Sequence, residues 1–170
     1  MNDRLNNLDF ELVIDQFRRR RWAGQRVQDI IQIMAHPSSG NLQVWDVQAV
    51  PNIFLTDMQV VQTVWRRDLE PTPILTNDAL KNWEPKIEVK SANLDKERLT
   101  VFISRFQAAN FPVFKPHDGQ FLDGTIYELA MSEGLCGARI YWHCQMPKGW
   151  EGLQKLLDEF MTFLKTAIEQ

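Results

Sequence analysis

The carboxyl-terminal segment constrains the fold most, because its large apolar side chains recur at helical spacing. Between residues 150 and 168 an apolar side chain returns every three or four positions, which places these side chains on one stripe of a helix. Pro147, just upstream, suits an early helical position. Burying such a stripe stabilises the chain only if another apolar surface lies beneath it. The stripe consists of Trp150, Leu153, Leu157, Phe160, Leu164 and Ala167.

A surface for this helix is predicted immediately upstream. Residues 125–133 and 138–145 are rich in β-prone side chains, and residues 134–137 between them begin and end with glycine. Glycines in a short connection between two such runs are typical of a β-hairpin. The pattern therefore predicts an antiparallel hairpin with a four-residue loop, whose apolar face packs against the final helix.

The amino-terminal part of the chain predicts a helix and a second hairpin. Residues 5–22 favour a helix over a strand, because no turn signal interrupts them before Gly24. Residues 37–41 have loop chemistry and separate two apolar runs. They predict a hairpin within residues 27–51, with a short helix before the loop as the alternative.

Residues 57–68 are predicted to form a helix. Thr56, followed three residues later by Gln59, makes a capping box at its start. Apolar side chains then return at helical spacing and would form the buried stripe. They are Met58, Val61, Val64 and Trp65.

Three further elements are predicted between residues 70 and 110. A loop with two prolines leads to a short helix from Thr76 to about Trp83. Residues 86–90 alternate apolar and charged side chains, which predicts a strand with one wet face. Residues 93–107 predict a helix, because Asp95 favours the first turn. The face that this helix would share comprises Leu94, Arg98, Val101, Phe102 and Phe106.

Together these elements predict an α+β fold. The chain has 170 residues, 44% of them hydrophobic, which suits a single domain over residues 1–170. We expect an antiparallel sheet of about four to six strands with helices packed on one face, ending in the hairpin and the amphipathic helix.

Composition and charge exclude several classes of protein. The apolar runs are far shorter than the roughly 20 residues of a membrane-spanning helix, and the amino terminus is charged. We therefore expect a cytoplasmic protein without a membrane segment or cleaved signal. Two cysteines are too few for a disulfide framework, and a formal net charge of −3 disfavours nucleic-acid binding. Weak binding of nucleic acid through Arg18 to Arg21 is an alternative hypothesis.

The sequence contains no motif for catalysis, a cofactor or a metal. It lacks a glycine-rich phosphate loop, Gly-x-Ser-x-Gly and His-Glu-x-x-His. His143 and Cys144 are adjacent on a predicted strand, so they point to opposite faces and cannot activate each other. We expect no catalytic residue, metal or cofactor. A small enzyme that brings together His117, Asp118 and Cys136 is the alternative hypothesis.

Several residues of the carboxyl-terminal third form a pattern. They are Phe111-Pro112, Asp123-Gly124-Thr125, Tyr127-Glu128-Leu129, Trp142, Pro147, Trp150, Leu153 and Leu156. This pattern resembles that of small bacterial proteins, some of which are similar to immunity proteins of toxin systems, including contact-dependent growth inhibition. The resemblance implies a non-enzymatic protein that binds a cognate toxin domain in the cytosol and blocks it.

The partner-binding candidates are acidic or aromatic residues near predicted turns and strand faces. Charges that steer a partner toward a desolvated aromatic centre suit such binding. The sequence leaves the toxin and the oligomeric state open. The candidates are Asp118, Asp123, Glu128, Glu133, Trp142 and Trp83.

Overall fold

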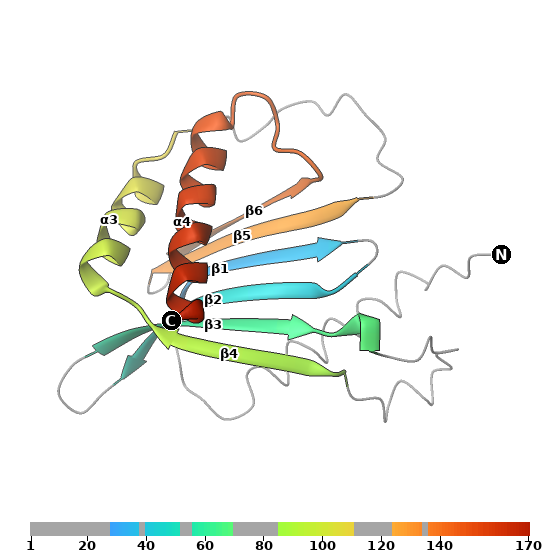
Figure 1. Ribbon diagram of the computed structural model, residues 1–170. Helices are drawn as coiled ribbons and strands as arrows, with labels where there is room; N and C mark the ends of the chain where they lie inside the picture. Colours follow the sequence, from blue (N-terminus) through green and yellow to red (C-terminus); the bar gives the residue numbers. More distant parts are fainter. Residues whose placement is uncertain (1–27, 38–39, 52–55, 70–84, 111–123, 134–135) are drawn as a thin grey trace.

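The computed structural model describes residues 28–37, 40–51, 56–69, 85–110, 124–133 and 136–170. Within them, six antiparallel strands form one sheet in the order β4-β3-β2-β1-β5-β6. Two α-helices pack side by side across one face of this sheet (Figure 1). The predicted α+β fold, with helices on one face of an antiparallel sheet, is therefore confirmed.

The first four strands form an antiparallel meander. They are β1 (Gln28–Pro37), β2 (Leu42–Pro51), β3 (Thr56–Trp65) and β4 (Ile87–Asn93). β1 and β2 confirm the hairpin predicted around residues 37–41, and the alternative helix before that loop is wrong. A 3-10 turn, η1 (Arg67–Leu69), follows β3.

The chain then adds two strands to the opposite side of β1. After α3 (Lys96–Gln107), β5 (Thr125–Glu133) pairs with β1, and β6 (Cys136–His143) pairs with β5. The final helix, α4 (Glu151–Glu169), returns across the sheet as far as β3 and β4. The hairpin and final helix predicted from the sequence are both present.

The helix predicted over residues 57–68 is wrong, because residues 56–65 form strand β3. The spacing of Met58, Val61 and Val64 suits a helix, but the same residues lie in a run of β-branched side chains that favours a strand. β3 pairs with β2 and β4 along its two edges, and both of its faces also carry partly or fully buried side chains. Burial on two faces removed the alternation by which a strand is recognised.

Smaller corrections concern the ends and faces of elements. The loop between β5 and β6 has two residues, since Glu133 pairs with Cys136, and not the four predicted. β4 is a strand as predicted, but Val89 is 59% exposed. In α3 the buried residues are Leu99, Phe102 and Phe106, whereas Val101 is 58% exposed. The helices predicted at residues 5–22 and 76–83 lie outside the described residues.

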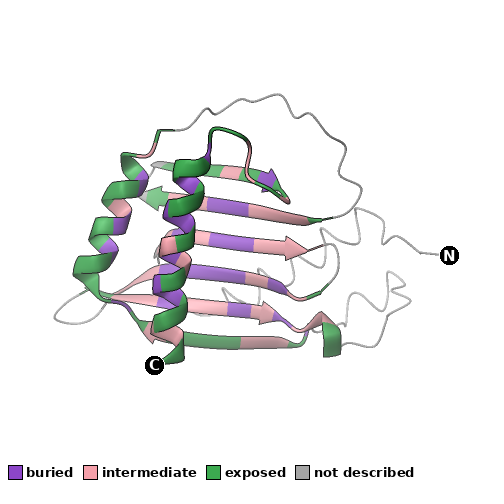
Figure 2. Cartoon of the chain, turned by 45° about the horizontal axis from the view of Figure 1, so that its top comes forward, coloured by how far each residue is buried: buried purple, intermediate pink, exposed green. Residues whose placement is uncertain are grey.

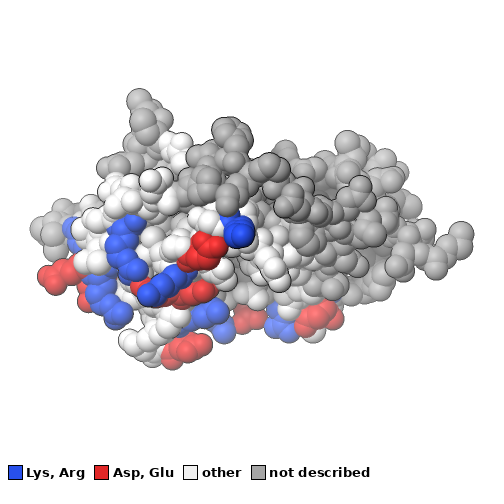
Figure 3. Space-filling view, turned by 90° about the horizontal axis from the view of Figure 1, so that it is seen from above, with Lys and Arg blue, Asp and Glu red and all other residues white. Residues whose placement is uncertain are grey.

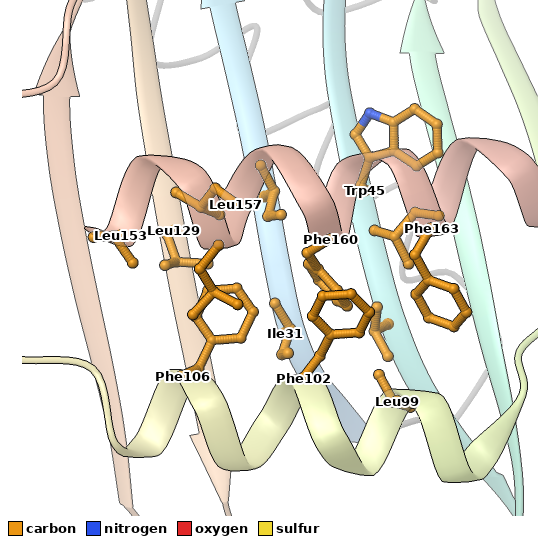
Figure 4. Packing of buried hydrophobic residues seen from close by; sticks show 14 of the residues in the cluster. Ile31, Trp45, Leu99, Phe102, Phe106, Leu129, Leu153, Leu157, Phe160 and Phe163 are labelled. Atoms are coloured by element: carbon orange, nitrogen blue, oxygen red, sulfur yellow. The ribbon is translucent and has the colours of Figure 1, made fainter. Parts of the chain in front are cut away.

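The core lies between the helices and the sheet (Figure 2). Phe160 of α4 is fully buried, with ring centroids 5.1 Å from Phe102 and 5.3 Å from Phe106 of α3. Beneath the rings lie strand side chains that include Ile31 and Leu129 (Figure 4). Most of the stripe predicted from the spacing of α4 is buried, but Ala167 is only partly buried, and the buried side also includes Leu156 and Phe163, which the predicted stripe left out.

Candidate functional site: a groove along α4

One flank of α4 faces a groove. Gln154, Leu157, Asp158, Met161 and Lys165 line it, and their spacing of three or four residues places them along one side of the helix. Eleven residues separate the first from the last, which corresponds to about 16 Å of helix. This flank lies on the side of α4 away from α3, where the strands extend beyond the helix (Figure 1). We call this site the α4 groove.

The floor of the α4 groove is aromatic. Trp45 comes from β2, Tyr127 from β5 and Trp142 from β6. Tyr127 and Trp142 face each other across paired strands and stack with centroids 5.4 Å apart and planes 13° apart. Trp150, at the start of α4, meets the edge of Trp142 at 6.5 Å. Figure 4 shows Trp45 across α4 from the phenylalanines of α3. Strand alternation thus gathers three aromatic side chains from distant segments on one surface.

The α4 groove is open and has mixed polarity. Its volume is about 580 Å³, which falls in the range of ligand-binding pockets. Met146 and Met161 supply flexible apolar walls, while Gln43 and Gln145 are polar. Methionine adapts its shape to different partners, and a tryptophan or tyrosine in a pocket is a frequent anchor of protein interfaces. These residue types favour a surface that binds a partner.

The loop between β6 and α4, which lines part of the α4 groove, has an unusual backbone. Cys144 follows the last residue of β6 and has a φ of 53°, in the left-handed region. Its N–H donates to the Thr125 carbonyl at 2.8 Å. Its Sγ lies against Gly124, where a β-carbon would overlap it. The thiol therefore has a structural contact as well as a place on the groove wall.

A second groove lies between α3 and the strand ends. Ile103 and Phe106 of α3 line it, opposite Met58 and Met131 of the sheet, and its volume is about 630 Å³. No charged residue is among the described residues that line it. Four of the five methionines that the structure describes therefore line one groove or the other.

The predicted partner-binding residues do not form one surface in the described part of the chain. Trp142 lies in the α4 groove, whereas Glu128 projects from the opposite face of the sheet. Glu133 ends β5, and its side chain lies outside the description. The remaining three candidates, Asp118, Asp123 and Trp83, lie outside the described residues.

Glu128 belongs to a set of buried polar groups on the sheet face opposite the helices. It is 1% exposed, and Arg139 Nε lies 3.0 Å from its Oε1. On the same face Asp46 is fully buried and accepts a hydrogen bond of 2.9 Å from Gln32. Removing Arg139 would take this cation away from a buried carboxylate, which is costly in free energy. A buried carboxylate of this kind is not free to steer a partner.

The described helices and their surroundings carry charges of both signs. Seen from above, Lys and Arg side chains lie among Asp and Glu over the described part of this face (Figure 3). Arg105 of α3 and Glu159 of α4 pair at 2.7 Å. Arg105 holds the pKa of Glu159 below its ordinary value through this contact.

Among the described residues, no cluster of three or more His, Cys, Asp or Glu side chains could hold a metal ion. In the same residues, no helix is long and apolar enough to cross a membrane. Of the residues in the alternative enzyme hypothesis, His117 and Asp118 lie outside the description, as does the side chain of Cys136. The Arg18–Arg21 run of the nucleic-acid alternative also lies outside it.

Comparisons with known proteins give no match. No family model matches the chain, and neither the curated proteins nor the solved structures contain a match to it. The resemblance to immunity proteins therefore stays a prediction.

Sequence reasoning missed most of the α4 groove. Trp45, Met146 and Met161 were not singled out as binding residues, and Tyr127 entered only through the pattern of the resemblance. Alternation along β5 could have separated Tyr127 from Glu128, since neighbouring strand residues point to opposite faces. The pairing of β5 with β1, which brings Tyr127 to the same floor as Trp45, has no local signal.

Proposed function

We propose that this chain is a non-enzymatic protein-binding module that holds part of its partner in the α4 groove. The partner that we propose is a cognate toxin domain, so that the chain acts as an immunity protein. One observation supports the binding role above others: Trp45, Tyr127 and Trp142 form the floor of an open groove whose walls contain two methionines. The identity of the partner rests on the resemblance of the carboxyl-terminal third.

The energetics favour binding at this surface. Tyr127 is only partly buried, so a partner that covers it removes further aromatic surface from water. The ring is held in place by its stacking on Trp142, so little conformational entropy is lost when it is covered. A rigid aromatic residue of this kind, surrounded by adaptable side chains, is typical of an interface hot spot.

The two tyrosines of the chain provide a matched test. Tyr127 lies in the α4 groove, and Tyr141 lies on the opposite face of the sheet with 54% of its surface exposed. The products of the genes that adjoin this one are purified, and their affinity is measured by calorimetry for wild type, Tyr127→Ala and Tyr141→Ala. We expect Tyr127→Ala to weaken binding by about tenfold or more, while Tyr141→Ala leaves it near wild type.

Growth protection completes the test. The wild-type chain should rescue cells that express the toxin, and Tyr127→Ala should rescue them poorly although its thermal melt shows that it is folded. A failure of the wild-type chain to bind or protect against any neighbouring gene product would refute the immunity role. Equal binding by the two tyrosine variants would refute the α4 groove as the interface.

A further inference from the structure

In the part of the chain that the structure describes, the two helices cover only part of the sheet. α3 and α4 are held together by ring contacts, including Phe102 with Phe163 at 5.4 Å. The α4 groove lies on the other flank of α4, where the next helix of such a layer would lie (Figure 1). Helices that pack side by side are separated by about 8–10 Å. The position beyond α4 therefore has a helix for one wall and the sheet for its floor, as the position of α4 itself does.

We propose that the α4 groove binds an amphipathic helix of the partner protein, lying alongside α4; this inference rests on the proposed binding role. The floor of the groove draws on β2, β1, β5 and β6, so the groove crosses the strands and does not follow a strand edge. An extended segment lying there has no strand with which to pair, and its buried N–H and C=O groups lack partners. A helix satisfies these groups internally.

The length and shape of the groove wall agree with a helix. The groove-lining flank of α4 spans about 16 Å, which matches three turns of a second helix. An occupant with apolar residues at positions i, i+3 or i+4, and i+7 presents one apolar stripe, and Tyr127 and Met161 are partly exposed groove residues that this stripe can cover. This is the arrangement by which amphipathic helices are held in apolar grooves.

Two charges on the wall specify the polar edge of the occupant. Asp158 and Lys165 are both exposed and both line the groove, seven residues apart along α4. Seven residues are about two turns, so both side chains project from the same side of the helix. The partner helix should carry a basic residue opposite Asp158 and an acidic residue about two turns away opposite Lys165. Like charges in either place would oppose binding.

A peptide selection tests the inference without the toxin. Random peptides of about 16 residues, long enough for a four-turn helix, are displayed on phage and selected against the purified full chain. Parallel selections use Lys165→Glu and the control variant Lys155→Glu. Lys155 is also exposed on α4, but it does not line the groove. Enriched peptides are synthesised, and their affinity and circular dichroism are measured with each protein.

We expect enriched peptides with apolar residues at helical spacing that become helical on binding. Lys165→Glu should weaken the peptides selected on wild type by about tenfold and should itself enrich peptides with a basic residue at the corresponding position. Lys155→Glu should bind them like wild type. Peptides that depend on the groove but bind without helical structure would overturn this inference and leave the binding role standing. A selection that enriches nothing dependent on the groove would overturn both.

Discussion

Phe160 connects the two helices, and its replacement tests how strongly α3 holds α4. The side chain is fully buried, and its ring contacts Phe102 at 5.1 Å in a tilted arrangement and Phe106 at 5.3 Å edge to face. Phe160→Ala should cost about 3–5 kcal/mol in the free energy of unfolding, because it removes buried surface and leaves a cavity. Single domains are stable by only about 5–15 kcal/mol, so that variant can unfold much of the protein.

A milder change separates ring geometry from burial. Phe160→Leu keeps most of the buried apolar surface but loses the two ring contacts with α3, together with a more distant one to Phe163 of its own helix at 6.2 Å. Each of the two pairs with α3 contributes about 0.5–1.5 kcal/mol beyond its buried area, so losing these two is expected to cost about 1–3 kcal/mol. Combining Phe160→Leu with Phe106→Leu in a double-mutant cycle should give a coupling of about 0.5–1.5 kcal/mol for that pair.

Urea unfolding at constant temperature, followed by tryptophan fluorescence, measures these quantities. Thr166→Ala, at an exposed position of α4, is the control and should change stability by less than about 0.5 kcal/mol. A coupling between the two phenylalanines that is zero within error would refute the claim that their rings interact as a pair. A loss below about 0.5 kcal/mol for Phe160→Leu would refute the magnitude derived from the two contacts.

Three further predictions concern single sites. Burial and the charge of Arg67 lower the pKa of His36 from 6.5 to about 4. Between these values the unfolded chain binds a proton that the folded chain does not, so acidification from pH 6.5 to 4 should lower the free energy of unfolding. The loss should be about 1–2 kcal/mol for this partly buried ring, and urea titrations at several pH values should show a smaller loss for His36→Gln. Gly124→Ala should lower the free energy of unfolding by about 1–3 kcal/mol, because the φ of Gly124 is 154° and the new β-carbon would overlap Cys144 Sγ. In the same urea titrations, adding Cys144→Ala should relieve part of this loss. Asp95→Ala should cost about 1 kcal/mol, because Asp95 accepts the N–H that caps α3 at 3.0 Å, whereas Asp95→Asn should cost less.

The parts of the fold that the sequence predicts are those with one buried face. Along α4 the buried side chains keep a single stripe, so spacing identifies both the helix and its inner side. The hairpin of β1 and β2 is marked by its loop residues, which act locally. β3 has no such signal, because Thr63 and Val60 are both fully buried although they point to opposite faces. When both faces of an element are buried, the spacing of its apolar residues fits a strand and a helix equally well.

The candidate site depends on contacts that spacing cannot reveal. Trp142 and Tyr127 are brought together by a local hairpin, whereas Trp142 was named as a candidate only because it is an aromatic residue on a predicted strand. Trp45 reaches them only because β5 joins the sheet beside β1, with almost ninety residues between the paired strands. The open flank of α4 is also a tertiary property, because the sequence does not show on which side α3 packs.

The composition of that flank distinguishes it from the rest of α4. The side packed on the sheet and α3 is apolar, as at Leu164, and the outer side is polar, as at Lys155 and Thr162. A flank that stayed buried in the protein would be apolar throughout. The groove flank instead places Met161 between Asp158 and Lys165, above an aromatic floor. This mixture suits a surface that is stable in water and still offers apolar area for a partner to bury. We therefore expect a partner that binds the groove reversibly.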